Sequence, residues 1–332
     1  MSAENRFIRR DGGEYAYAIE STKIKFGVGV IRELGWEAKS LGMTRVAIYT
    51  DSEVVQLEHF SAAVQSVRDT GLDLEIYDEV EVEPTDRSFT AASQFAIEGK
   101  FDGFISVGGG SVMDTAKASN LYSSYPNELL TYVNLPVGLA KPVPGKLMPH
   151  IACPTTFGTA SECTGIAIFD IIDMEMKTGI AHQALTPTLG MLDPNALMSL
   201  PRPVIASNAF DVFSHAIESL TAKPYTERIA PESPDKRPLL QGANPYSNVS
   251  CKEAIRLIGA NLEQALNEPN VVTAREPLML AGMLAGIGFG NAGCHIPHAM
   301  SYAVAGLVQN YFPEGWPNDH PMVPHGISVI LN

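Results

Sequence analysis

The sequence predicts an α/β domain with a parallel sheet over residues 1–200, followed by an all-α domain over residues 201–332. In the first part, short β-rich runs alternate with helical stretches, and this alternation gives a parallel sheet with helices on both faces. In the second part, long amphipathic patterns dominate. The pattern changes at Pro201 and Pro203, which places the predicted domain boundary near residue 200.

The first domain is expected to contain three strands that are each followed by a helix. Buried strands are predicted from the apolar runs at 45–50, 74–77 and 104–107. The helices behind them are expected at 54–70, 89–98 and 112–121. A further strand begins at Ile151 and runs into a polar turn, and residues 166–169 are expected to form a hairpin arm.

The second domain is expected to contain three long helices and one long surface loop. The helices are predicted at 205–222, 250–266 and 275–287. Residues 224–245 are rich in Pro, Ser, Asn and charged residues, so they are expected to form a surface loop, which is often functional at this length. The sequence ends at Asn332 inside an apolar helix-like run that begins at 324–326, so a truncation that removes further C-terminal helices is expected.

The composition is that of an ordinary globular protein, with 45% hydrophobic and 18% charged residues. The net charge of −14, from 23 basic and 37 acidic residues, argues against a nucleic-acid or anionic-membrane partner. No apolar run reaches membrane-spanning length, and residues 1–10 contain no apolar signal-peptide core. The four cysteines include no Cys-x-x-Cys pair, which is typical of reduced thiols. The sequence therefore predicts a cytoplasmic protein.

A glycine turn at Gly108, Gly109 and Gly110, followed by Ser111, forms the first candidate site. It connects a predicted strand to a predicted helix, so backbone N–H groups at the helix N-terminus can approach a pyrophosphate. Glycine suits these positions because a Cβ would block the approach and because a positive φ is expected at some of them. A tight turn without a ligand is the alternative, and the spacing departs from Gly-x-Gly-x-x-Gly.

Asp51 and a group of hydroxyls extend this candidate site. Asp51 ends an earlier strand, where it can accept hydrogen bonds from an adenosine ribose and so favour NAD over NADP; a helix N-cap explains it equally well. Thr155, Thr156 and Thr159 follow another strand, where they can bind phosphate or ribose oxygens or cap the turn. Lys177 lies in a segment that could fold over a cofactor, but its composition alone indicates a surface lysine.

Asp211 and His215 are the first candidate metal ligands. Their i, i+4 spacing places them on one face of a predicted helix, and a buried aspartate needs a partner. His298 follows a glycine-rich helix and His325 follows a proline. One carboxylate with three imidazoles suits Fe²⁺ or Zn²⁺ with one coordination position left open. A metal site and a dinucleotide site on one chain indicate hydride chemistry.

Other histidines compete for the same role, because a single histidine is more often structural than a ligand. His295 lies three residues before His298, and His320 lies five residues before His325. The remaining histidines have no supporting context and are interpreted as structural or surface residues: His59, His150 and His182.

The motifs around these residues resemble those of the iron-containing (group III) alcohol dehydrogenases, in the same order and over nearly the whole chain. They are Gly108-Gly-Gly-Ser-x-x-Asp114-x-x-Lys117, Pro154-Thr-Thr-x-Gly-Thr-x-Ser-Glu162, Asp211-x-x-x-His215 and Pro324-His-Gly326. The hydroxyacid–oxoacid transhydrogenase branch is a closer match. The motifs typical of that branch are Val82-Glu-Pro-Thr-Asp86, Gly165-Ile-Ala-Ile-Phe-Asp170, Arg237-Pro-x-x-Gln-Gly-x-Asn-Pro245 and Gly286-Ile-Gly-Phe-Gly-Asn-Ala-Gly293.

The resemblance implies a dehydroquinate-synthase-like fold, with an N-terminal dinucleotide-binding domain, a helical metal-binding domain and a cleft between them. The implied metal ligands are Asp211, His215, His298 and His325. His298 is preferred over His295 because His298-Ala-Met-Ser-Tyr302 matches the family's ligand-bearing segment. The residues implied for NAD are Asp51, Gly108, Gly109, Gly110, Ser111, Asp114, Thr155, Thr156, Thr159 and Lys177.

The chain departs from the family pattern at three residues. Phe157 and Ala160 replace small or glycine residues, which is expected to narrow the nicotinamide end of the site. Tyr302 stands where many members have a further histidine near the substrate, so it is a candidate substrate contact. Arg237, on the branch-specific loop, is the candidate cation for a substrate carboxylate.

The resemblance implies hydride transfer through NAD between a hydroxy acid and an oxo acid, with a metal ion that lowers the pKa of the substrate hydroxyl. The implied reaction converts 4-hydroxybutyrate and 2-oxoglutarate into succinate semialdehyde and 2-hydroxyglutarate. The alternatives are an ordinary alcohol dehydrogenase that releases NADH, a metal-dependent lyase of the dehydroquinate-synthase type, and a non-catalytic binding protein. The partners expected are a small-molecule substrate and a second copy of the chain in a homodimer.

Overall fold

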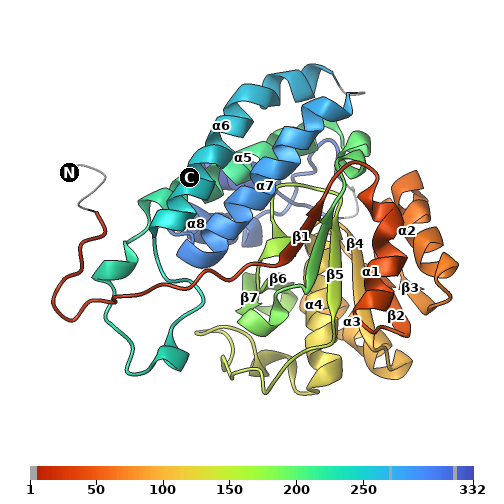
Figure 1. The fold of residues 1–332 in the computed structure, drawn as a ribbon, viewed down its shortest axis with the longest axis horizontal. Helices are drawn as coiled ribbons and strands as arrows, with labels where there is room; N and C mark the ends of the chain where they lie inside the picture. The colour runs from red at the N-terminus through yellow and green to blue at the C-terminus, as the bar shows by residue number, and fades with distance from the viewer. Residues whose placement is uncertain (1–5, 269–270, 317–319) are drawn as a thin grey trace.

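The computed structural model describes residues 6–268, 271–316 and 320–332. A parallel six-stranded sheet forms one half of the molecule and long helices form the other half (Figure 1). The strand order is β1-β8-β5-β4-β2-β3. The strands are β1 (Lys23–Phe26), β2 (Arg45–Tyr49), β3 (Asp73–Tyr77), β4 (Gly103–Gly108), β5 (His150–Pro154) and β8 (Leu189–Leu192). The predicted α/β fold with a parallel sheet and a helical second part is confirmed.

Helices cover both faces of the sheet, because the strands are buried on both sides. In β2, Val46 and Ile48 pack against α1 (Leu34–Ser40) and α2 (Glu58–Asp69). The alternate residues, Ala47 and Tyr49, pack against α3 (Asp86–Gly99) and α4 (Gly110–Ser124) on the opposite face. Side chains of a strand alternate between faces, so a strand buried on both sides is apolar throughout. This is why the central strands could be predicted as continuous apolar runs.

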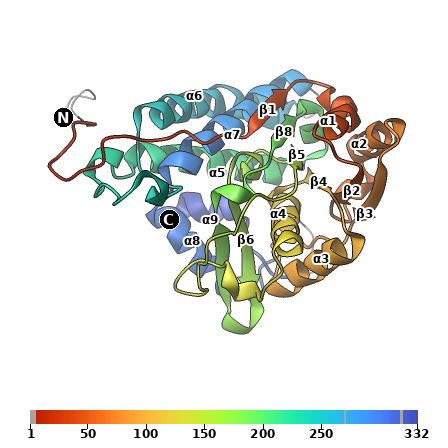
Figure 2. The same cartoon turned by 60° about the horizontal axis from the view of Figure 1, so that its bottom comes forward.

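A two-stranded antiparallel hairpin extends from the sheet toward the helical half. It consists of β6 (Ile166–Ile171) and β7 (Met176–Ala181), and the expected hairpin arm at 166–169 lies in its first strand. In Figure 2 the hairpin lies between α4 and the C-terminal helix α8 (Ile296–Gly306), and β6 contacts α4 while β7 contacts α8. The hairpin therefore connects the two halves of the molecule.

Three long helices form the core of the second half, as the amphipathic patterns predict. They are α5 (Arg202–Thr221), α6 (Pro245–Asn267) and α7 (Val272–Ala292), and their apolar faces form one buried cluster. Helix α6 begins five residues earlier than predicted because the Asn244 side chain accepts a hydrogen bond from the Ser247 amide and Pro245 occupies the first turn. Two shorter helices follow, α8 and α9 (His325–Leu331).

The segment between α5 and α6 contains only two short 3-10 turns, Tyr225–Glu227 and Pro234–Lys236, so the long loop predicted there is present. Within the described residues, no single helix is both long and apolar enough to cross a membrane. Helices α7 and α8 pass that test only as a pair, and the pair is bent by 101°. The change from strand–helix alternation to helices falls at Pro201, and the domain boundary near residue 200 stays a prediction.

The chain before β1 runs in an extended form along the helical half (Figure 1). The backbone amide of Ala18 donates a hydrogen bond of 2.8 Å to the Gln241 side chain. The amide of Glu20 donates one of 2.8 Å to the side chain of Asn291 on α7. Strand β1 then joins the edge of the sheet beside β8, so the same segment contacts both halves.

Candidate active site

A cavity of about 930 Å³ lies between the sheet and the helical half. Its walls include the loops that follow β2, β3, β4 and β5, together with side chains of α5, α8 and α9. Ligands of open parallel sheets bind outside the carboxyl ends of the strands, so the cavity lies where this fold class places its site. Most of the site residues predicted from sequence line it: Asp51, Gly109, Gly110, Ser111, Asp114, Thr155, Thr156, Thr159, Lys177, Asp211, His215, His298, Tyr302 and His325.

The glycine turn connects β4 to α4 as predicted. Backbone conformation is not the reason that these positions need glycine. Gly109 has a φ of −75°, and neither Gly108 nor Gly110 has a positive φ. A Cβ at Gly108 would lie 2.4 Å from the Val112 side chain, and one at Gly110 would lie 2.7 Å from the Thr159 side chain. Glycine is therefore required here because of close packing. The first N–H groups of α4 have no partner within the helix and can bind an anion.

Asp51 caps the turn after β2 and lines the cavity, and its contact with a ribose stays a prediction. Its Oδ1 atom accepts hydrogen bonds from the backbone amides of Glu53 at 3.0 Å and Val54 at 2.8 Å. The carboxylate also lines the cavity, and burial raises its pKa. The local turn thus holds one carboxylate oxygen and orients the side chain at the cavity wall.

Asp114 connects α4 to the hairpin. Its Oδ1 atom accepts a hydrogen bond of 2.5 Å from the Ser161 hydroxyl, and its Oδ2 atom accepts one of 2.9 Å from the Ile168 amide. The buried ammonium of Lys117 lies 3.4 Å from the same carboxylate. Both carboxylate oxygens are therefore engaged within the protein, and Asp114 supports the cavity wall from behind the glycine turn.

The threonines after β5 lie beside the glycine turn, since a Cβ at Gly110 would lie 2.7 Å from the Thr159 side chain. Thr155, Thr156 and Thr159 all line the cavity. The Oγ1 atom of Thr156 is buried and has no hydrogen-bond partner among the described residues. A buried hydroxyl without a partner costs free energy, so this atom fits a ligand oxygen in the cavity.

Lys177 is a buried residue and not the surface lysine that composition suggests. Only 4% of its side chain is exposed, and its Nζ atom lies 2.5 Å from a carboxylate oxygen of Glu83 and 2.9 Å from one of Asp170. Burial opposes its charge, but the two carboxylates raise its pKa above the ordinary value. Glu83 has a φ of 57°, an uncommon conformation for a residue with a Cβ. The hairpin thus places a lysine that stays protonated near pH 7 in the cavity wall.

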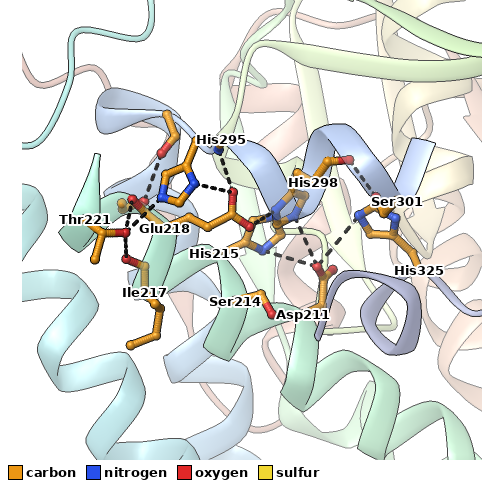
Figure 3. Close-up of polar contacts among 12 residues, drawn as sticks. Asp211, Ser214, His215, Ile217, Glu218, Thr221, His295, His298, Ser301 and His325 are labelled. Carbon is orange, nitrogen blue, oxygen red and sulfur yellow. Dashed lines mark hydrogen bonds and ion pairs between the residues drawn. The ribbon is translucent and has the colours of Figure 1, made fainter. Parts of the chain in front are cut away.

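The four predicted metal ligands converge from three helices (Figure 3). The Oδ1 atom of Asp211 lies 3.7 Å from the Nδ1 atom of His215, its i+4 neighbour on α5. The same oxygen lies 3.5 Å from the Nε2 atom of His298 on α8 and 3.8 Å from that of His325 on α9. The spacing is made possible by Gly326, because a Cβ there would lie 1.9 Å from the Ser207 carbonyl of α5.

These donor atoms fit a divalent cation. The Oδ1 atom of Asp211, the Nδ1 atom of His215 and the Nε2 atom of His298 are buried without a hydrogen-bond partner among the described residues. Their separations exceed ordinary hydrogen-bond lengths, and unpartnered buried polar atoms are costly. A cation between them would satisfy all three, and carboxylate with imidazole donors suits Fe²⁺ or Zn²⁺.

Metal binding requires neutral imidazoles and an ionised carboxylate, and three of the four ligands favour these states. For His298 burial opposes the charge, but Cys294, Asp211 and Glu218 raise its pKa, so a metal that binds there must displace a proton. Burial lowers the pKa of His215 to about 3, so its ring is neutral near pH 7. Burial also lowers the pKa of His325. For Asp211 burial opposes ionisation, but the neighbouring imidazoles hold the pKa of its carboxyl below the ordinary range. The His215 ring stacks on Phe289 of α7 at a centroid distance of 4.0 Å, which holds its plane.

The competing histidines lie outside this cluster. His295 is exposed, and its Nε2 atom lies 2.8 Å from the Thr221 hydroxyl. His320 is absent from the described residues that line the cavity. The buried His150 pairs with the Ser106 hydroxyl at 2.8 Å, as expected for a structural histidine. The preference for His298 and His325 agrees with this geometry.

A carboxylate and a thiol lie beside the cluster, and neither was predicted from the sequence. Glu218 lies one helical turn after His215, and its carboxylate contacts the Nδ1 atom of His298. Cys294 lies in the cavity wall, and its sulfur, a nitrogen of His215 and a nitrogen of His298 all lie within 4.8 Å of one another. The i, i+4, i+7 spacing of Asp211, His215 and Glu218 was the available signal, since it places all three on one helix face.

The two predicted substrate residues have different positions. Tyr302 lines the cavity with its ring centroid 6.3 Å from that of His325, and burial raises the pKa of its phenol to about 12. Arg237 is absent from the described residues that line the cavity, and it pairs with Glu14 through bonds of 3.0 and 3.1 Å. This position does not support the substrate role predicted for Arg237, because Glu14 of the N-terminal segment already pairs with its guanidinium.

Known proteins resemble this chain along nearly its whole length. Residues 21–194 match the model of the iron-containing alcohol dehydrogenases, and residues 239–310 match that of the C-terminal region of the same family. Among solved structures, a 1,3-propanediol oxidoreductase shares 25% identity with a TM-score of 0.80, over 95% of this chain and 73% of its own. An alcohol dehydrogenase from Oenococcus oeni shares 26% identity with a TM-score of 0.79, over 95% and 73%. The chain belongs to the iron-containing alcohol dehydrogenase family and is an enzyme of this oxidoreductase class.

The more similar curated relatives belong to one branch of this family. The mitochondrial hydroxyacid–oxoacid transhydrogenase of Bos taurus is 47% identical over 96% of this chain and 69% of its own length. The Homo sapiens protein of the same name is 44% identical over 96% and 68%. This similarity confirms the predicted resemblance to the transhydrogenase branch.

The mitochondrial names of these relatives contradict the predicted cytoplasmic location. That prediction rested on net charge, hydropathy and cysteine content. These properties describe how a folded chain meets water and a reducing environment, and they do not distinguish one aqueous compartment from another.

Proposed function

We propose that the chain is a hydroxyacid–oxoacid transhydrogenase that uses NAD and one divalent metal ion, Fe²⁺ or Zn²⁺. The proposal is supported by the relatives of that name at 44–47% identity over 96% of the chain. The observation that carries the chemistry is the convergence of one carboxylate and three imidazoles, with separations of 3.5–3.8 Å, on a cavity that also contains the glycine turn.

Asp211, His215, His298 and His325 are the proposed metal ligands. Bound metal would supply Lewis acidity at the substrate oxygen, and bound NAD would supply the hydride acceptor. Asp211 brings the negative charge, and the neutral rings of His215 and His325 bring nitrogen lone pairs. Phe289 stacks on the His215 ring and both side chains are buried, and electrostatic contacts are stronger in such surroundings than in water.

The proposed dinucleotide contacts line the sheet side of the same cavity. The backbone N–H groups from Gly108 to Ser111 are proposed to bind the pyrophosphate, Asp51 the adenosine ribose, and the Thr155, Thr156 and Thr159 hydroxyls phosphate or ribose oxygens. Asp114 orients this wall, and Lys177 is proposed to contact the cofactor. Tyr302 is the proposed substrate contact, because its phenol stays protonated near pH 7 and can donate a hydrogen bond.

The reaction proposed is the exchange of hydride between 4-hydroxybutyrate and 2-oxoglutarate. A test supplies both acids to purified, metal-loaded enzyme without added NAD. Formation of succinate semialdehyde and 2-hydroxyglutarate, without free NADH, supports the proposal. Accumulation of NADH from hydroxy acid and NAD alone supports the second candidate, an ordinary alcohol dehydrogenase, which the family membership also favours.

The residues that line the cavity argue against the lyase alternative. A lyase of the dehydroquinate-synthase type acts on a phosphate-bearing substrate and needs several basic residues near the metal. Among the described residues that line the cavity, Lys177 is the sole lysine or arginine, and it already pairs with two carboxylates. The homodimer stays a prediction, which light scattering of the purified protein would test.

A further inference from the structure

A buried carboxylate that no proposed step uses lies directly behind the metal-ligand cluster. It belongs to Glu218, which lies on α5 three residues after His215. Only 2% of its side chain is exposed. We propose that Glu218 is a positioning residue, which holds His298 in the tautomer and orientation that direct its Nε2 atom at the metal. The inference rests on the proposed metal centre and deepens it.

The contacts of Glu218 are short and divided between its two oxygens (Figure 3). Its Oε1 atom lies 2.5 Å from the Nδ1 atom of His298. Its Oε2 atom accepts a hydrogen bond of 2.5 Å from the backbone amide of His295. A backbone amide can only donate, so Oε2 is an acceptor, and an ionised Glu218 accepts hydrogen bonds through both of its oxygens.

An acceptor at Nδ1 decides which nitrogen of His298 is free. A metal would bind the neutral imidazole, which carries one hydrogen, and the bond to Glu218 requires that hydrogen at Nδ1. The lone pair is then on Nε2, the atom that lies 3.5 Å from Asp211 and lacks a hydrogen-bond partner among the described residues. Carboxylates that bond the outer nitrogen of a metal-bound histidine also raise its basicity.

The second contact of Glu218 fixes the helix that carries His298. The amide of His295 lies at the N-cap of α8, just after Gly293, whose φ is 98°. A negative charge is favourable at a helix N-terminus, where backbone N–H groups have no partner within the helix. One carboxylate of α5 thereby sets both the start of α8 and the rotation of its ligand.

This arrangement also explains why His298 and not His295 belongs to the cluster. Glu218 binds the backbone amide of His295, and the His295 ring is exposed and pairs with Thr221. The same carboxylate binds the ring of His298. The His295 ring lies farther from Glu218, with its Nδ1 atom 3.8 Å from Oε2, so the short ring contact of this carboxylate is with His298.

The test is the Glu218→Gln variant, which keeps the shape of the side chain and removes its charge. We expect metal affinity, measured by equilibrium dialysis with Zn²⁺, to fall by about 10- to 100-fold. The visible spectrum of the Co²⁺-loaded variant should change, because one ligand is reoriented. The matched control is Glu37→Gln, which removes another buried carboxylate. Glu37 lies on α1 and pairs with Lys25 at 2.7 Å. Its metal affinity and cobalt spectrum should equal those of the parent protein.

A variant of His298 separates this inference from the proposed metal centre. If His298→Ala abolishes tight metal binding while Glu218→Gln binds metal as the parent protein does, the positioning role is overturned and the metal centre stands. If neither variant alters metal binding, the metal centre itself is overturned. The unsubstituted protein gives an independent check, because nitrogen NMR of ¹⁵N-histidine-labelled, Zn²⁺-loaded protein reports the tautomer. Hydrogen at Nε2 of His298 would contradict the proposal even if Glu218→Gln failed to fold.

Discussion

At the scale of single residues, several buried polar atoms around the cavity have no hydrogen-bond partner among the described residues. They belong to Thr156, Asp211, His215 and His298. Each such atom costs free energy in the folded chain, and the cost is recovered when a ligand supplies the missing partner. These four residues line both the sheet side and the helical side of the cavity, so a ligand there would satisfy atoms on both sides.

Glu162 gives a prediction about stability and pH. Burial raises the pKa of Glu162 from the ordinary 4.5 to about 7, so the folded chain binds this proton more tightly than the unfolded chain. The associated stability is present below about pH 4.5 and is lost as the pH rises through about 7. Relative to Glu162→Gln, the parent protein should lose roughly 3 kcal/mol between about pH 5 and about pH 8. Urea unfolding at both pH values measures this, and parallel pH profiles would contradict it.

Arg237 gives a prediction about specificity. The Arg237→Ala variant should show unchanged KM values for the hydroxy acid and the oxo acid, because the guanidinium pairs with Glu14 and not with the cavity. Its thermal unfolding temperature should fall, since the buried Glu14 carboxylate loses its partner. Steady-state kinetics and calorimetry check the two parts. A raised KM for the acids alone would restore the substrate role.

At the scale of elements, the approach of α9 to α5 determines whether His325 reaches Asp211. Gly326 lies against the Ser207 carbonyl, and a Cβ there would lie 1.9 Å from that oxygen and 2.9 Å from Asp211. Gly326→Ala should therefore displace α9, destabilise the protein by about 1–3 kcal/mol or more, and weaken metal binding. Calorimetry and equilibrium dialysis measure these effects.

The control for Gly326 is a glycine in a helix without close neighbours. Gly259 lies in the exposed part of α6, and a Cβ there would meet no atom within 4 Å. Gly259→Ala should stabilise the protein by about 0.5–1 kcal/mol, because alanine loses less backbone entropy in a helix. If both variants behaved alike, the close approach of α9 to α5 would not be the cause.

The elements that could be predicted from sequence are those with a strong local pattern. Strands such as β2 and β4 are apolar on both faces, and α5, α6 and α7 show long amphipathic periods. The strands β1 and β8 were missed because each has only four residues, with alternating lysines in one and a glycine in the other. Their pairing is a tertiary property, since β1 joins β8 across more than 160 residues.

The same distinction applies to the site. Glycine, threonine and histidine motifs could be predicted because their chemistry is local. The pairing of Lys177 with Glu83 and Asp170 could not, since it depends on how the hairpin packs on the loop after β3. The ion pair between Arg237 and Glu14 could not be predicted either, because the two residues are 223 positions apart in sequence.

At the scale of the whole molecule, the site draws its groups from both halves, so metal binding should stabilise the entire chain. A ligand at 100 times its Kd stabilises the folded state by about 2.7 kcal/mol. Chelation followed by calorimetry should therefore lower the unfolding temperature by several degrees, and added Zn²⁺ should restore it. Asp211→Asn should show no such response to Zn²⁺. An equal shift in that variant would mean that the metal binds elsewhere.

The extended segment before β1 has a consequence for how the chain reaches its native state. Its amides bond side chains 223 and 271 residues later, and β1 closes the sheet only after β8 exists. Contacts of such high sequence separation form late, since a long loop must close first. During synthesis β2 to β5 can associate early, whereas Ala18 has no partner until Gln241 is made and Glu20 has none until Asn291 of α7 is made. The segment before β1 is thus among the last parts of the described chain to become ordered.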